Sequence, residues 1–167
     1  MKKQVYIING SGGVGKDTFV NIVSEIAPCP VMNFSSVDKV KEIAKAVGWS
    51  GGKTEKDRKF LSDLKLLCTD YNDMPFNSIK NKVEEFMDND AGMLFIHIRE
   101  PNEIQRAKVA FNAITVLVKR ESVKQITSNM ADNGVFNYDY DVIVYNDGDL
   151  SDLRTTAKAV IKETYIN

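Results

Sequence analysis

Residues 10–18, Gly-Ser-Gly-Gly-Val-Gly-Lys-Asp-Thr, constrain the fold more than any other part of this sequence. The apolar run at residues 5–9 predicts a buried strand before them, and residues such as Phe19 and Ile22 follow them at helical spacing. Glycines reach backbone angles that a Cβ disfavours and let the main chain approach a ligand closely. N–H groups at the helix start, together with the positive end of the helix dipole, then face an anion. We therefore expect a phosphate-binding loop in which Lys16 reaches the β- and γ-phosphates of a nucleotide.

The loop departs at one position from the pattern G-x-x-x-x-G-K-[ST]. The residue after Lys16 is Asp17, and the hydroxyl comes one residue later, at Thr18. Nucleoside monophosphate kinases commonly carry G-K-x-T, and the sequence has no N-K-x-D guanine signature, so the departure favours small-molecule kinases over GTPases. The alternative is a glycine-rich turn that only joins a strand to a helix, and the flanking elements favour phosphate binding over it.

Length and charge limit the class of protein. The 167 residues fit one domain with a full core, and the balanced net charge of −1 predicts no nucleic-acid surface. Cys29 and Cys68 lack zinc or disulfide spacing and fit small buried hydrophobes in a reducing compartment. No apolar run reaches membrane-spanning length, so we expect a cytoplasmic protein without a membrane partner. The sequence does not specify an oligomeric state.

Apolar runs predict strands at residues 5–9, 31–34, 93–98, 114–118 and 142–145. Helices alternate with them. The first should end before Pro28, Ser36 should cap the second, and Thr54 with Asp57 should form a capping box for the third. Residues expected on inner helix faces are Val37, Val40, Ala44 and Val47; Phe60, Leu61, Leu64, Leu67 and Cys68; Ile79, Val83, Phe86 and Met87; Ile104, Ala107 and Phe111; and Leu150, Leu153, Ala157 and Val160.

This alternation predicts an α/β fold: a five-stranded parallel sheet with helices on both faces, in three α/β/α layers. Ligands of such sheets bind beyond the carboxyl ends of the strands. That edge should gather residues 10–18, 35–38, 97–100, 119–120 and 146–148. The helices of residues 36–90 should form an insertion that covers a second substrate, and the polar residues 119–140 resemble a short lid.

Five stretches together resemble the deoxynucleoside monophosphate kinase-like family of P-loop kinases, which is related to the phosphomevalonate kinases. Their order and spacing span nearly the whole chain and make the match more specific than any one stretch. The stretches are residues 10–18 (its G-x-x-x-S-G-K-D-T loop, with Val14 for the usual Ser), 35–42 (S-F-A-D-P-L-K-E), 97–103 (D-V-R-F-P-N-E), 129–141 (the length of H-x-S/T-E, with Asp132 at the Glu) and 141–150 (D-x-V-I-x-N-D-G-S-L).

The resemblance implies a P-loop kinase that transfers a phosphoryl group from ATP to a nucleoside or deoxynucleoside monophosphate, with Mg²⁺. The protein must position two anions and place cations around the transferred group. The residues implied to bind ATP are Gly10, Ser11, Gly12, Gly13, Val14, Gly15, Lys16, Asp17, Thr18, Arg120, Asn146, Asp147 and Gly148. Those implied to bind the acceptor are Ser35, Asp38, Arg58 and Arg99, and Asp17 and Thr18 would hold the metal, directly or through water.

The chain has five arginines, and their places separate their expected roles. Arg99 and Arg120 follow predicted strands and match arginines of the family, so with Lys16 they are the expected catalytic residues. Arg58 lies in the insertion, where it would meet the acceptor phosphate. Arg106 lies on a helix near the lid, and Arg154 should be solvated. For each of them the alternative is a surface charge.

Two departures from the family pattern bear on catalysis. His97 stands where the family has an Asp at a strand end, and neutral imidazole is a poor ligand for Mg²⁺. A strand-end histidine satisfied by local hydrogen bonds is the alternative to a catalytic one. Asn129 replaces the His of the lid. Two other functions therefore stay open: a nucleotide-binding protein with weak or no kinase activity, and a kinase of another small phosphorylated acceptor.

Overall fold

The computed structural model describes residues 2–123 and 134–166. Within them, five strands form one parallel sheet: β1 (Gln4–Asn9), β2 (Val31–Ser35), β3 (Met93–His97), β4 (Ile114–Lys119) and β5 (Val142–Tyr145). Their order in the sheet is β2-β3-β1-β4-β5. The predicted five-stranded parallel sheet is confirmed. Since β1 is flanked by β3 and β4, its carboxyl end lies where the strand order reverses, which is where such sheets bind ligands.

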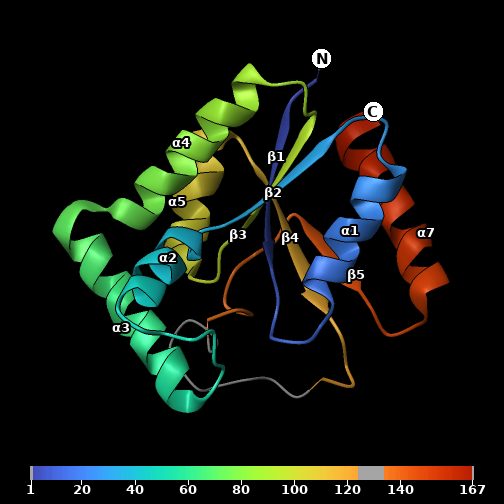
Figure 1. The fold of residues 1–167 in the computed structure, drawn as a ribbon. Helices are drawn as coiled ribbons and strands as arrows, with labels where there is room; N and C mark the ends of the chain where they lie inside the picture. Colours follow the sequence, from blue (N-terminus) through green and yellow to red (C-terminus); the bar gives the residue numbers. More distant parts are fainter. Residues whose placement is uncertain (1, 124–133, 167) are drawn as a thin grey trace.

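Helices cover both faces of the sheet (Figure 1). On one face, α1 (Lys16–Ile26) and α7 (Leu150–Ile161) pack together, and Phe19, Val23 and Ala157 join the core there. On the other face lie α4 (Met74–Asp88) and α5 (Pro101–Phe111), which contribute Phe86 and Ile104. A π-helical turn, Lys162–Ile166, continues α7. The predicted three layers are therefore confirmed.

Two further helices, α2 (Asp38–Ala46) and α3 (Glu55–Asn72), extend away from the sheet (Figure 1). The predicted capping box of α3 is confirmed, since Thr54 Oγ1 accepts from the Asp57 N–H and Asp57 Oδ2 accepts from the Thr54 N–H. The predicted inner face is wrong for Phe60 and Leu67, which are exposed, and α3 buries no residue. The reason is that α3 packs beside α2 and α4 and not flat on the sheet.

The start of α2 also differs from the prediction. Its N-cap is Val37 and not Ser36, and no side chain caps it. The Ser36 N–H donates to His97 O at 3.1 Å, so Ser36 continues from the end of β2 beside β3. Asp38 Oδ2 instead accepts the Ser35 N–H at 2.9 Å and tightens the turn that leads into the helix.

Besides Phe60 and Leu67, three more residues expected on inner faces are exposed. Val47 and Leu150 stand at helix ends, Val47 as the C-cap of α2 and Leu150 as the first residue of α7, where the chain no longer faces the core. Met87 lies in the last turn of α4 and is half exposed.

The predicted lid, residues 119–140, is described only at its two ends. Asn129 and Asp132 lie outside the described residues. Within 134–140, Val135 and Tyr140 are buried in the core on the α4–α5 side of the sheet. No helix in the part of the chain that the structure describes is long and apolar enough to cross a membrane.

Candidate active site

The phosphate loop joins the end of β1 to the start of α1 at the carboxyl edge of the sheet. At two positions of the loop, the surrounding atoms leave no room for a side chain, so only glycine fits. Gly10 has φ 148°, and a Cβ there would collide with Val118 O. Gly15 is the left-handed N-cap of α1, with φ 95°, and a Cβ there would collide with the Asn146 side chain. The first N–H groups of α1 are thereby left open toward an anion.

The Lys16 side chain, at the start of α1, folds back over the phosphate loop. Its ammonium donates to Gly10 O at 2.6 Å and to Ser11 O at 2.9 Å, which keeps the charge at the mouth of the loop. Ser11 Oγ is buried and has no hydrogen-bond partner among the described residues. A buried polar atom left unpaired is unusual and costs free energy. Both features fit a loop whose hydrogen bonds are completed by the oxygens of a phosphate.

Asn146 supports the loop from behind. Its Nδ2 donates to Val14 O at 2.8 Å, and its own N–H donates to Lys119 O at 2.8 Å, so it joins the loop to the ends of β4 and β5. The sequence motifs pointed to residues 146–148 as part of the ATP site, and they carried no signal for this side-chain role. Asp147 Oδ1 accepts the Glu121 N–H at 2.7 Å, and Gly148 is exposed.

Asn9, which the sequence motifs did not single out, connects three parts of the site. It is the last residue of β1 and is buried. Its Oδ1 accepts the Gly10 N–H at 2.8 Å, and its Nδ2 donates to Arg99 O at 3.1 Å and to the Tyr140 hydroxyl at 2.8 Å. Tyr140 in turn donates to Val135 O at 2.8 Å, and burial raises the pKa of Tyr140 to about 12. The hydroxyl is therefore neutral at physiological pH.

His97 lies at the end of β3, opposite Ser35 of β2 in the strand register. Its Nε2 is 2.9 Å from Asn33 Oδ1, and because an amide oxygen only accepts, Nε2 carries the proton. Burial lowers the pKa of His97, opposed by the nearby Asp17 carboxylate and assisted by Lys16. The imidazole is therefore neutral at pH 7. The strand-end hydrogen bond expected as the alternative to catalysis is present.

The oxygen donors beside Lys16 are compatible with Mg²⁺ but do not form a complete site. Asp17 and Thr18 are both exposed in the first turn of α1, and Asp17 Oδ1 is 4.0 Å from His97 Nε2. Across residues 2–123 and 134–166, no group of three or more His, Cys, Asp or Glu side chains could hold a metal ion. Hard cations prefer oxygen ligands, and Mg²⁺ keeps water and phosphate oxygens in its shell. One carboxylate and one hydroxyl fit that mode of binding.

The expected acceptor residues come from three elements. Asp38 accepts the Ser35 N–H and lies 3.6 Å from the Lys41 ammonium, so the two residues of the β2–α2 turn are brought together. Arg58 lies on α3 and is half-buried. Arg99 and Arg120 are exposed just beyond β3 and β4, the strands on either side of β1. Cations therefore stand on both sides of the phosphate loop.

Comparison with known proteins shows similarity in structure only. No family model matches the sequence, and a search of curated proteins finds no match. Among solved structures, the chain resembles a tunicamycin resistance protein of Deinococcus radiodurans (12% identity, TM-score 0.56, 98% of this chain and 96% of that chain). It also resembles thymidylate kinase of Candida albicans (11%, 0.51, 97% and 92%) and shikimate kinase of Aquifex aeolicus (10%, 0.50, 98% and 99%). The fold is that of the P-loop kinases.

Arg106 and Arg154, the two arginines with no site role expected, both form ion pairs. Arg106 forms a bidentate ion pair with Asp73, and its guanidinium lies 3.7 Å from the centre of the Phe76 ring. Arg154 donates to Glu25 at 2.7 Å across α7 and α1. In the sequence, Arg106 and Arg154 lie within predicted helices and not after predicted strands. This difference in position separated them from Arg99 and Arg120.

Proposed function

We propose that this protein transfers the γ-phosphoryl group of ATP to a nucleoside or deoxynucleoside monophosphate, which yields the diphosphate and ADP. One observation carries the proposal. The phosphate loop leaves β1 between β3 and β4, and an exposed arginine follows each of these flanking strands, Arg99 just beyond β3 and Arg120 directly after β4. This arrangement suits phosphoryl transfer because the reaction needs little covalent help and much positive charge around the transferred group.

Each residue then has a distinct task. The loop N–H groups and Lys16 bind the phosphates of ATP, and Arg120 neutralises charge on the same side. Arg99 and Arg58 bind the phosphate of the acceptor, since the arginine fork pairs two oxygens at once. Ser35 and Asp38 lie at the end of β2, where they would hold the sugar or base. Residues 146–148 would lie beside the ATP base.

Magnesium would supply further positive charge between the phosphates when bound. Asp17 and Thr18 would hold it, directly or through water. The neutral imidazole of His97 adds no hard ligand, so this chain has one carboxylate fewer at that position than the family it resembles.

The acceptor assignment comes from the sequence motifs. The similar structures include a thymidylate kinase and a shikimate kinase, so this fold accommodates different acceptors. The stretches at residues 35–42 and 97–103 resemble those of the deoxynucleoside monophosphate kinase-like family, which favours a nucleotide acceptor.

A coupled assay of ADP release tests the proposal. Mg-ATP is offered with a panel of ribo- and deoxynucleoside monophosphates, and the Arg99→Lys and Arg120→Lys variants serve as comparisons. Turnover with one acceptor, lost in both variants, supports the proposal. ATP binding without turnover for any member of the panel contradicts it.

The position of His97 favours a second candidate, a nucleotide-binding protein with weak or no kinase activity. The same assay separates the two, because this candidate binds ATP with no acceptor-dependent ADP release. Turnover only with a phosphorylated acceptor other than a nucleotide would instead identify a kinase of another small molecule.

A further inference from the structure

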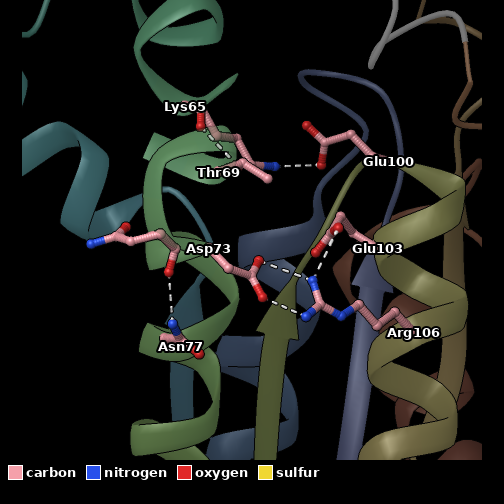
Figure 2. A network of polar contacts seen from close by, with 8 residues as sticks. Lys65, Thr69, Asp73, Asn77, Glu100, Glu103 and Arg106 are labelled. Atoms are coloured by element: carbon pink, nitrogen blue, oxygen red, sulfur yellow. Dashed lines mark hydrogen bonds and ion pairs between the residues drawn. The ribbon is translucent and has the colours of Figure 1, made fainter. Parts of the chain in front are cut away.

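Helix α3 packs beside α2 and α4 and has no buried residue of its own. Figure 2 shows two ion pairs that join α3 and the residue after it, Asp73, to α5 and the residue before it, Glu100. At the end of α3, Asp73 pairs with Arg106. Nearer the site, Lys65 Nζ lies 2.5 Å from Glu100 Oε2. The two pairs differ in their surroundings, and only the second lies at the carboxyl edge of the sheet.

In the Asp73–Arg106 pair, the guanidinium already has several partners within the protein. Both guanidinium nitrogens of its fork bind the one carboxylate, Phe76 covers the guanidinium, and Glu103 lies 3.8 Å from it. Asp73 has a left-handed backbone, φ 56°, at the junction of α3 and α4. The pair therefore fixes the base of the arm formed by α2 and α3.

The Lys65–Glu100 pair is built differently. The Lys65 side chain is 12% exposed, whereas Lys59, in an ion pair with Asp63 on the same helix, is 76% exposed. Lys65 is thus a shielded cation with one carboxylate partner among its described ion pairs. Glu100 is 33% exposed and can turn toward water if Lys65 takes another partner.

This cation lies close to Arg99, one of the residues proposed above to bind the acceptor. Glu100 directly follows Arg99, at the N-terminal end of α5. Lys65 lies seven residues after Arg58, two helical turns along α3, and both belong to the half-buried side of that helix. Through Glu100, Lys65 therefore lies close to the segment that follows β3 and carries Arg99, and Arg58 lies two turns earlier along α3.

We propose, on the basis of the function proposed above, that Lys65 is a further binding residue for the acceptor phosphate, and that Glu100 is its counter-ion until the acceptor arrives. A phosphate oxygen replaces the Glu100 carboxylate on the Lys65 ammonium as the acceptor binds. The site is then specific for an acceptor that carries a phosphate, since a neutral acceptor cannot displace a carboxylate from a shielded ammonium.

The test compares Lys65→Gln, Glu100→Gln and the control Lys59→Gln. Affinity is measured by calorimetry, with ADP bound, for the best monophosphate of the panel and for the same nucleoside without phosphate. Lys65→Gln should weaken monophosphate binding by about tenfold, equal to ~1.4 kcal/mol, and leave nucleoside binding unchanged. Glu100→Gln should tighten monophosphate binding, because the competing carboxylate is gone. Lys59→Gln should change neither.

A purely structural pair predicts another pattern. Loss of either partner would then displace α3, and both variants would weaken monophosphate and nucleoside binding alike. That result overturns the proposal. If the parent protein binds no member of the panel, the function proposed above fails, and inorganic phosphate becomes the probe. A phosphate-dependent rise in melting temperature with ADP bound, lost in Lys65→Gln alone, supports the Lys65 site, and an equal rise in parent and variant overturns it.

Discussion

Asn9 and Tyr140, 131 positions apart in the sequence, are joined by a buried 2.8 Å hydrogen bond. Through it, the chain that returns to the sheet at residues 134–140 contacts the residue that begins the phosphate loop. The same amide holds the Gly10 N–H and the Arg99 carbonyl oxygen. The placement of the loop and of Arg99 therefore depends on one side chain and its partner.

Tyr140→Phe should lower the turnover number more than it raises the Michaelis constant for ATP. It leaves one Asn9 N–H and the Val135 carbonyl oxygen without a partner, so the backbone at Arg99 loses part of its support. The expected loss of stability is about 1–3 kcal/mol. Tyr138→Phe is the matched control, since the Tyr138 hydroxyl donates to Gln105 and not to Asn9. Equal kinetic effects of the two variants would contradict the positioning role of Tyr140.

Alkaline pH should weaken the fold in part through Tyr140. Its pKa is about 12 in the folded protein because of burial, against an ordinary value of about 10. The folded state thus binds the Tyr140 proton more tightly than the unfolded state does. The contribution of the protonated hydroxyl to the free energy of unfolding is complete below about pH 10, and it is lost as the pH rises toward 12. In urea unfolding from about pH 9 to about pH 11.5, the stability difference between parent and Tyr140→Phe should shrink. Tyr71→Phe, at an exposed tyrosine of α3, is the matched control.

Lys16→Ala should abolish most of the stabilisation by ATP without unfolding the protein. Ligand at ~100 times its dissociation constant stabilises the native state by about 2.7 kcal/mol, so ATP should raise the melting temperature of the parent. Lys16 contacts two loop carbonyls and is not part of the buried core, so its removal should leave the protein folded. Lys158→Ala, at an exposed lysine of α7, is the control. Equal ATP-induced shifts in the parent and Lys16→Ala would refute the phosphate-loop assignment.

Asp38→Asn and Arg58→Ala should raise the Michaelis constant for the acceptor and leave ATP affinity nearly unchanged. Asparagine retains an oxygen that can accept the Ser35 N–H, so it removes charge while preserving the turn before α2. Both residues belong to the β2–α2–α3 part of the chain and not to the phosphate loop. A loss of ATP affinity with normal acceptor binding would reverse the two sites.

The sequence predicted the sheet and the loop well for a physical reason. Strands buried on both faces are continuous apolar runs, and the glycines of the loop are required by backbone geometry, as at Gly10 and Gly15. Helical periodicity predicted where the helices lie in the sequence, but it did not predict which helices pack on the sheet and which stay exposed. Leu67 has the spacing of an inner face, and it is exposed because α3 lies beyond the sheet.

The polar contacts of the site could not be predicted in the same way. Asn9, Asn146 and Lys65 act through partners distant in sequence, and their positions follow from strand order and the placement of α3. A single sequence carries no signal for such pairs. The position of His97 at a strand end was predictable, whereas its hydrogen bond to Asn33 depends on the neighbouring strand.

His97→Asp tests whether the missing carboxylate limits turnover. The imidazole nitrogen lies 4.0 Å from Asp17 Oδ1, so an aspartate there would bring two carboxylates close together. Their repulsion is relieved by a divalent cation, which prefers oxygen ligands. The Mg²⁺ concentration for half-maximal ADP release should therefore fall, and the protein without Mg²⁺ should melt at a lower temperature.

His97→Asn separates this charge effect from the loss of the imidazole. Asparagine is neutral and can still donate to Asn33 Oδ1, so it should keep the melting temperature closer to that of the parent and should not lower the Mg²⁺ requirement. Mg²⁺ titrations of ADP release, with melting curves for all three proteins, make the comparison. If His97→Asp folds and has the same metal requirement as the parent, the strand-end position plays no part in binding the metal. If both variants lose activity equally at all Mg²⁺ concentrations, the hydrogen bond between the imidazole and Asn33 is what the reaction requires.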